Sequence, residues 1–159
     1  MVIISDTSPI TNLIQIGRLG LLRALFNKII IPELVYQELI LIPGQLIVLS
    51  EADWMEIRGL SDKTPFTQLS TQLDKGEAEA IALCMELNAD LLIIDEFKGR
   101  KIAEKHGLKL TGLLGILLRA KEKGLLVAVK PEMDRLKSAA GFRIHPKLYL
   151  DILILAGES

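Results

Sequence analysis

The stretch Val2-Ile3-Ile4-Ser5-Asp6 decides the fold of this chain, together with its distant counterpart Leu91-Leu92-Ile93-Ile94-Asp95. Each is a short apolar run, rich in Ile, Leu or Val, that ends in an aspartate. Such a run is typical of a strand that is buried on both faces. Open α/β sheets bind ligands at the carboxyl ends of their strands. We therefore expect both aspartates at that edge of a sheet.

The composition bounds the class of protein. The chain has 159 residues, of which 50% are hydrophobic and only 4% aromatic, which predicts a single domain with an aliphatic core. The net charge of −1 argues against broad binding to duplex nucleic acid, although a local basic groove stays open. The mean hydropathy of +0.36 predicts a wide interface with a second copy or a partner.

Three kinds of sequence signal are missing. There is no secretory leader pattern, no apolar stretch of about 20 residues that would span a membrane, and no disulfide framework, because Cys84 is the single cysteine. We therefore expect a cytoplasmic protein without a membrane partner.

Short aliphatic runs alternate with helical patterns along the chain. This alternation predicts βαβ units and a three-layer α/β/α fold with a mostly parallel central sheet. We expect one domain, 1–159, with a core over 1–125 and a helical C-terminal extension over 126–159. The first helix is expected to be capped by Ser8, with Pro9 at its first position. Strands are predicted at 2–5, 29–31, 91–94 and 109–110, candidate strands at 46–49 and 54–57, and a solvated loop through 61–65.

Two further carboxylates accompany helices near the expected edge. Glu38 and Glu77 lie close to Asp6 and Asp95 if the crossovers are right-handed, and Asp74 is expected to cap the helix that carries Glu77. Four converging carboxylates without Lys or Arg between them would be strongly destabilising in the absence of a cation. Mg²⁺ or Mn²⁺ suits an all-oxygen set, and such a site carries out phosphate chemistry. Each residue also has a structural alternative: the aspartates as caps, Glu77 as a partner of the helix dipole, and Glu38 as a solvated helix residue.

The order and spacing of four motifs resemble the PIN-domain family, in particular a prokaryotic PIN-like branch related to the VapC-type toxins. The resemblance is best over residues 1 to about 125. It implies a parallel sheet between helices and Mg²⁺- or Mn²⁺-dependent cleavage of single-stranded RNA. The motifs are Asp6-Thr7-Ser8, Pro32-Glu33-Leu34-Val35-Tyr36-Gln37-Glu38-Leu39, Gly76-Glu77-Ala78-Glu79-Ala80-Ile81-Ala82-Leu83 and Leu92-Ile93-Ile94-Asp95-Glu96.

The resemblance assigns roles to the acidic residues. Asp6 corresponds to the first-strand metal ligand, Glu38 to the helix carboxylate and Asp95 to the aspartate after the fourth strand. The third acidic position falls on Glu77 or Glu79, and we favour Glu77 because it stands at the helix start. The two glutamates are about 200° apart around a helix, so we expect only one of them to point inward.

Other polar residues are secondary candidates. Ser8 could bind a phosphate or order a metal-bound water, and Glu96 is a further acidic candidate. The basic cluster that follows could contact an RNA backbone or form a solvated helix face; its members are Lys98, Arg100 and Lys101.

The resemblance also implies partners, namely a homodimer and an antitoxin protein. The main hypothesis is therefore a ribonuclease that is the toxin of a type II toxin–antitoxin pair. The alternative is a PIN-like module with little or no cleavage, which binds nucleic acid or protein. A phosphotransfer protein of receiver or haloacid-dehalogenase type fits less well, because a dehalogenase needs Asp-x-Asp where this chain has Asp6-Thr7-Ser8.

Overall fold

Five parallel strands form one sheet in the order β3-β2-β1-β4-β5, in a computed structural model that describes residues 1–159. The strand order reverses between β1 and β4, which are neighbours although they are far apart in sequence. The prediction of a parallel central sheet is confirmed. The strands are β1 (Ile3–Ser5), β2 (Ile29–Pro32), β3 (Met55–Arg58), β4 (Leu91–Ile93) and β5 (Leu110–Thr111).

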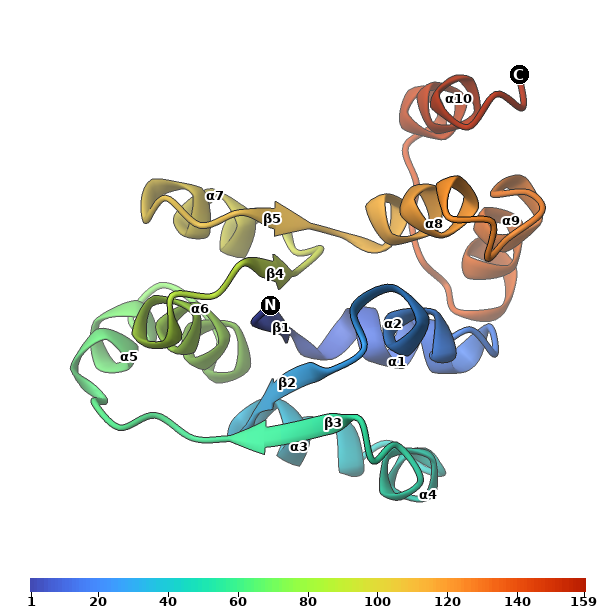
Figure 1. Cartoon of the computed structure of the whole chain (residues 1–159). Helices are drawn as coiled ribbons and strands as arrows, with labels where there is room; N and C mark the ends of the chain where they lie inside the picture. The colour runs from blue at the N-terminus through green and yellow to red at the C-terminus, as the bar shows by residue number, and fades with distance from the viewer.

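Helices cover both faces of this sheet, which confirms the three-layer α/β/α fold. In Figure 1, α5, α6 and α7 lie on one side of the strands, and α1, α2 and α8 lie on the other. No helix combines the length and the apolar character that a membrane span requires. The helices are α1 (Thr7–Gln15), α2 (Gly20–Phe26), α3 (Glu33–Ile40), α4 (Gln45–Ser50), α5 (Thr64–Leu69), α6 (Lys75–Leu87), α7 (Phe97–Lys105), α8 (Leu113–Glu122), α9 (Lys130–Ala139) and α10 (Pro146–Leu155).

The strands separate two hydrophobic cores. Successive side chains of a strand point to opposite faces of the sheet, so Ile3 and Ile93 pack with α1, α2 and α8, whereas Ile4 and Leu92 pack with α6 and α7. This double burial explains why the strands are continuous apolar runs rather than alternating patterns.

The C-terminal segment joins the first of these cores. Met133 and Leu136 of α9 and Ile152 and Leu153 of α10 are buried in it. Figure 1 shows α9 and α10 beyond α8, on the side of the sheet opposite α6. Residues 126–159 therefore contribute helices to the layer that α1, α2 and α8 begin.

Three local predictions are wrong. The first helix begins at Thr7, so its N-cap is Asp6, which has an extended backbone, and not Ser8. The segment 46–49 belongs to helix α4 rather than a strand, because a four-residue apolar run does not distinguish the two. The segment 61–65 is not all loop: Asp62 accepts a hydrogen bond from the Thr64 N–H at 2.9 Å, and α5 follows with a proline in its first turn.

Candidate active site

The strand register brings Asp6 and Asp95 to one edge of the sheet. Ser5 pairs with Ile93 across β1 and β4, and the Asp6 N–H donates to the Ile93 carbonyl at 2.9 Å. Asp95 follows two residues after Ile93. The point where the strand order reverses is where open α/β sheets form their ligand crevice. The expectation that these two strands are neighbours is therefore confirmed.

Asp6 is a buried carboxyl group, with only 5% of the residue exposed. Burial raises its pKa to about 7, since the charged form is poorly solvated there. The backbone hydrogen bond from Thr7 lowers the pKa, and the negative charges of Asp74, Glu38 and Asp95 raise it. Asp6 is thus part of an acidic cluster with no basic partner of its own.

Glu38 reaches this cluster from α3. Its Oε2 accepts a hydrogen bond from Thr7 Oγ1 at 2.6 Å, which ties α3 to the start of α1. Its carboxyl group also lies against Gly76 of α6, where a Cβ atom would overlap it. A glycine at position 76 therefore allows α6 to begin beside the Glu38 carboxylate.

Glu77 enters the cluster from the first turn of α6. Its N–H donates to Asp74 Oδ1 at 2.9 Å, so the predicted N-cap at Asp74 is confirmed. The residue is 8% exposed, and its burial raises the pKa of its carboxyl group to about 9. The hydrogen bond and charge of Asp74 and the charges of Asp6 and Glu96 act in the same direction. A Cβ atom at Gly99 would lie 2.9 Å from Glu77 Oε2, so α7 also packs closely on this side chain.

Asp74 is a further member of the cluster, beyond the four carboxylates that the sequence predicts. The sequence predicts it only as a helix cap, yet among the neighbouring charges it has the largest effect on the pKa of Asp6. The signal for this role is its place at the start of the same helix as Glu77, on the carboxyl edge of the sheet.

Asp95 lies at one side of the cluster. Its Oδ1 accepts a hydrogen bond from the Leu113 N–H at 3.0 Å at the start of α8, and its Oδ2 is buried without a hydrogen-bond partner. Burial raises its pKa, while the bond from Leu113 and the charge of Arg100 lower it. Arg100 donates from Nη1 to the Ile94 carbonyl at 2.6 Å. A basic side chain therefore stands beside this carboxylate, contrary to the expectation of a set without Lys or Arg.

Glu77 and Glu79 are both buried, so the expectation that only one points inward is wrong. Helix α6 is enclosed by the sheet and by α3, α5 and α7, and it therefore buries more than one face. Glu77 faces Asp6, whereas Glu79 Oε1 accepts the Leu34 N–H at 2.8 Å in the first turn of α3.

The secondary candidates lie at the margin of the site. Glu96 caps α7 by accepting the Gly99 N–H at 2.8 Å. Ser8 is exposed on α1, next to Thr7. Lys98 and Lys101 are exposed on α7, and the Lys101 Nζ lies 5.1 Å from the centre of the Phe97 ring.

The donor chemistry of the cluster fits a hard divalent cation. All its side-chain donors are carboxylate oxygens, and Asp95 Oδ2 is a buried oxygen without a partner. The structure contains no group of three or more His, Cys, Asp or Glu side chains arranged to hold a metal ion. Mg²⁺ needs only one or two carboxylates, because it keeps several of its waters. Asp6 and Asp95 are two carboxylates at adjacent strand ends.

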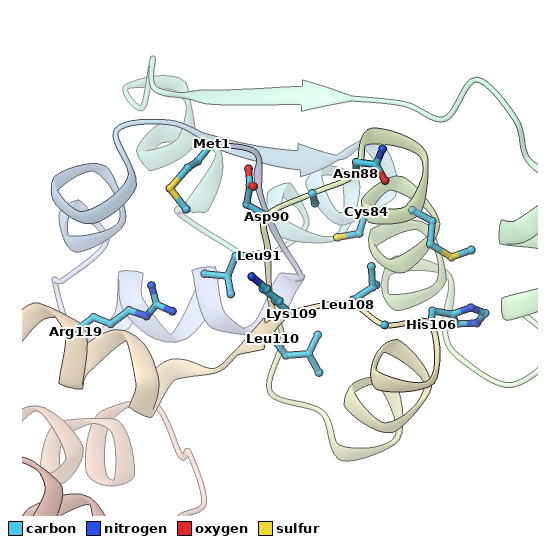
Figure 2. A pocket seen from close by; sticks show the side chains of 13 residues that line it. Met1, Cys84, Asn88, Asp90, Leu91, His106, Leu108, Lys109, Leu110 and Arg119 are labelled. Atoms are coloured by element: carbon cyan, nitrogen blue, oxygen red, sulfur yellow. The ribbon is translucent and has the colours of Figure 1, made fainter.

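A cavity of about 790 Å³ lies at the opposite edge of the sheet, where the strands begin. Figure 2 shows Met1, Asp90, Leu91 and Lys109 around it, all at or just before the starts of strands β1, β4 and β5. None of the clustered carboxylates lines this cavity. The acidic site and this cavity are therefore separate features.

The comparisons with known proteins agree with this architecture. A PilT N-terminus domain protein from the hyperthermophilic archaeon Sulfolobus solfataricus P2 has a similar structure, with a TM-score of 0.55 and 21% sequence identity over 91% of this chain and 98% of that one. No curated protein matches the chain in sequence. The family model DUF3368, described as a PIN domain, matches residues 2–158. The chain therefore belongs to the PIN-domain family.

Proposed function

We propose that this protein is a divalent-metal-dependent endoribonuclease that cleaves single-stranded RNA in the cytoplasm. The observation that carries the proposal is the convergence of Asp6 and Asp95 at the β1–β4 edge, with Glu38 and Glu77 around them. Asp6 and Glu77 are buried, and buried carboxyl groups cost stability, so their presence favours a function that needs them. PIN domains are nuclease-type folds, which agrees with this use of the edge.

Two carboxylates would hold the cation directly. Asp95 contributes the buried, unpartnered Oδ2, and Asp6 lies at the neighbouring strand end. Glu38 and Glu77 complete the acidic wall, where they can hold bound waters in place. Held by Asp6 and Asp95, a divalent ion would supply polarisation of a phosphoryl oxygen and a more acidic bound water.

The remaining chemistry belongs to the side chains of the chain. Glu77 lies beside Asp6 with its pKa raised by burial and by the neighbouring carboxyl groups, so it can hold or release a proton next to a reacting group. Thr7 fixes the orientation of Glu38 through its 2.6 Å hydrogen bond. Arg100, beside Asp95, can pair with the phosphate that the reaction leaves more negative.

The proposal includes a place in a toxin–antitoxin pair, as a homodimer held by an antitoxin protein. Exposed apolar side chains on two parts of the surface support it, because such patches mark interaction sites. One patch includes Leu41, Leu46 and Ile47 of the α3–α4 region, and the other includes Leu150, Ile154 and Leu155 of α10.

A second function is a PIN module that binds without cleaving. Two observations favour it: one oxygen of Asp95 is engaged by the Leu113 N–H, and no three acidic side chains are arranged as metal ligands. On this hypothesis the carboxylates would be a remnant of a nuclease site.

One experiment separates the two functions. The purified chain is incubated with labelled single-stranded RNAs in Mn²⁺, in Mg²⁺ and in chelator, with Asp6→Asn as the control. Cleavage that requires the metal and is lost in the variant supports the nuclease. No cleavage, or equal cleavage by the variant, which would indicate a contaminant, refutes it and favours the binding module.

A further inference from the structure

A cavity of about 430 Å³ opens beside the acidic cluster. Asp95 and Arg100 line it from the β4–α7 junction, and Gly112 lines it from the β5–α8 junction. The opposite wall comes from the C-terminal segment, through Phe142 and Arg143. Because Asp95 belongs to both the cavity and the cluster, a ligand at the carboxylates can extend directly into this space.

Two glycines of the lining, Gly112 and Gly115, allow close packing next to the acidic cluster. A Cβ atom at Gly112 would overlap Asp95 Oδ1 and lie 3.2 Å from Arg100 Nη1. A Cβ atom at Gly115 would overlap Thr111 Oγ1. Side chains at these positions would displace the Asp95 carboxyl group and the wall next to it, so the glycines allow the cluster and the cavity to adjoin.

The lining combines apolar side chains with cationic groups. The apolar part consists of Leu110, Leu114, Phe142, Leu148 and Ile152. Arg143 lies on the same wall as Phe142, and Arg100 uses one of its five donors on the Ile94 carbonyl. Aromatic rings and guanidinium planes are the groups on which unpaired bases of single-stranded RNA stack. The volume lies within the range of about 300–1,000 Å³ that is usual for small-ligand sites.

We infer that this cavity holds the base of a nucleotide next to the cleaved phosphate, in contact with the Phe142 ring and the guanidinium groups of Arg100 and Arg143. This inference rests on the proposed function for the position of the phosphate. It makes the C-terminal segment a specificity-determining wall of the site. A free phosphate would leave the apolar wall unused, whereas a nucleotide uses both the cations and the wall.

The test is a binding cycle with short single-stranded RNAs in which each nucleotide in turn is made abasic. Binding is measured in Mn²⁺ with the full chain carrying Asp6→Asn, which prevents cleavage. Loss of the stacked base should weaken binding roughly 5- to 150-fold at one position. That loss of affinity should vanish when Phe142→Leu is added, because leucine has no aromatic ring. It should be present with Phe142→Tyr, because tyrosine keeps the ring.

Two further variants complete the design. Arg143→Gln should weaken binding of the intact RNA, whereas Arg119→Gln, in the cavity at the amino edge, should leave it unchanged. If Phe142→Leu does not fold, Arg143→Gln carries the test alone. An abasic penalty of equal size with and without the Phe142→Leu substitution, or unchanged binding by Arg143→Gln, overturns the inference.

The outcomes separate this inference from the proposed function. Cleavage by the unmodified chain, combined with an unchanged abasic penalty in Phe142→Leu, keeps the nuclease and removes the base site. Absence of cleavage by the unmodified chain removes the nuclease, while the binding cycle still decides whether a base occupies the cavity.

Discussion

The N–H of Asp6 donates to the carbonyl of Ile93 at 2.9 Å, so the residue after β1 is fixed against the end of β4. This bond fixes the backbone of Asp6 at the edge of the sheet. Its side chain is buried there among the negative charges of Asp74, Glu38 and Asp95. Substitution of Asp6 therefore measures how much free energy of folding this placement costs.

Asp6→Asn should lose RNA cleavage and gain stability when no divalent ion is present. The amide keeps the shape of the side chain but removes a buried charge and its repulsion with Glu38, Asp74 and Asp95. The midpoint of thermal unfolding should rise in chelator. Added Mn²⁺ should raise the midpoint of the unmodified chain more than that of the variant, because ligand binding stabilises the folded state. A strongly destabilised variant would instead show that Asp6 is a structural cap.

Glu77 and Glu79 should differ in their effects on cleavage. Glu77→Gln removes the ionisable group that faces Asp6, and we expect a loss of at least about tenfold in kcat/KM. Glu79→Gln keeps a carbonyl oxygen for the Leu34 N–H, so cleavage should remain within about threefold. The two variants are measured with the same RNA and metal. Equal losses would contradict the assignment of Glu77 as the third acidic residue.

Much of the fold was predictable because strands that are buried on both faces consist mainly of apolar residues. The runs at 2–5 and 91–94 are apolar without alternation, which is typical of strands between two helical layers. The convergence of Asp6 and Asp95 followed from the same pattern, since doubly wound sheets bring distant strand ends together.

The details of the site were not predictable, because they depend on how elements that are distant in sequence pack around it. Helical spacing predicted that only one of Glu77 and Glu79 points inward, but helices on several sides of α6 bury both. The charge of Asp74 reaches Asp6 only across elements that are far apart in sequence. Arg100 looked like part of a solvated basic cluster, yet its side chain turns inward to the end of β4.

The stability of the chain should fall as pH rises when no divalent ion is present. Burial and neighbouring carboxyl groups raise the pKa of Glu77 from 4.5 to about 9, and burial raises that of Asp6 from 3.8 to about 7. At a pH between the unfolded and folded pKa values of either group, the folded state binds more protons than the unfolded state. The extra stability is complete below the unfolded values and is lost as pH passes the folded ones.

Thermal unfolding in chelator between about pH 5 and about pH 9 measures this dependence. Glu77→Gln should flatten the fall above neutral pH, because it removes the group that titrates last. Glu122→Gln, at an exposed position on α8, is the matched control and should leave the fall in place. A pH profile identical in all three chains would mean that Glu77 does not carry the effect.

Asp95 should have two separable roles. Asp95→Asn keeps an oxygen for the Leu113 N–H, whereas Asp95→Ala removes the acceptor at the start of α8. Both changes should abolish cleavage, but the alanine variant should be less stable than the asparagine variant by about 1 kcal/mol. Chemical denaturation in chelator compares them. Equal stabilities of the two variants would show that Asp95 does not stabilise the start of α8.

Glu132 should stabilise the attachment of the C-terminal helices. It is 3% exposed and accepts hydrogen bonds from Arg18, which follows α1, and from Arg135 in its own helix. Glu132→Gln would leave both guanidinium groups short of a charged acceptor, and because the arginines are partly exposed we expect a loss of roughly 1–3 kcal/mol. Glu56→Gln is the matched control, since Glu56 also lies between two cations, Lys28 and Arg58, but at the surface. Its loss should stay below about 1 kcal/mol. Equal losses in the two variants, measured by chemical denaturation, would show that burial of Glu132 does not strengthen the contact between α9 and α1.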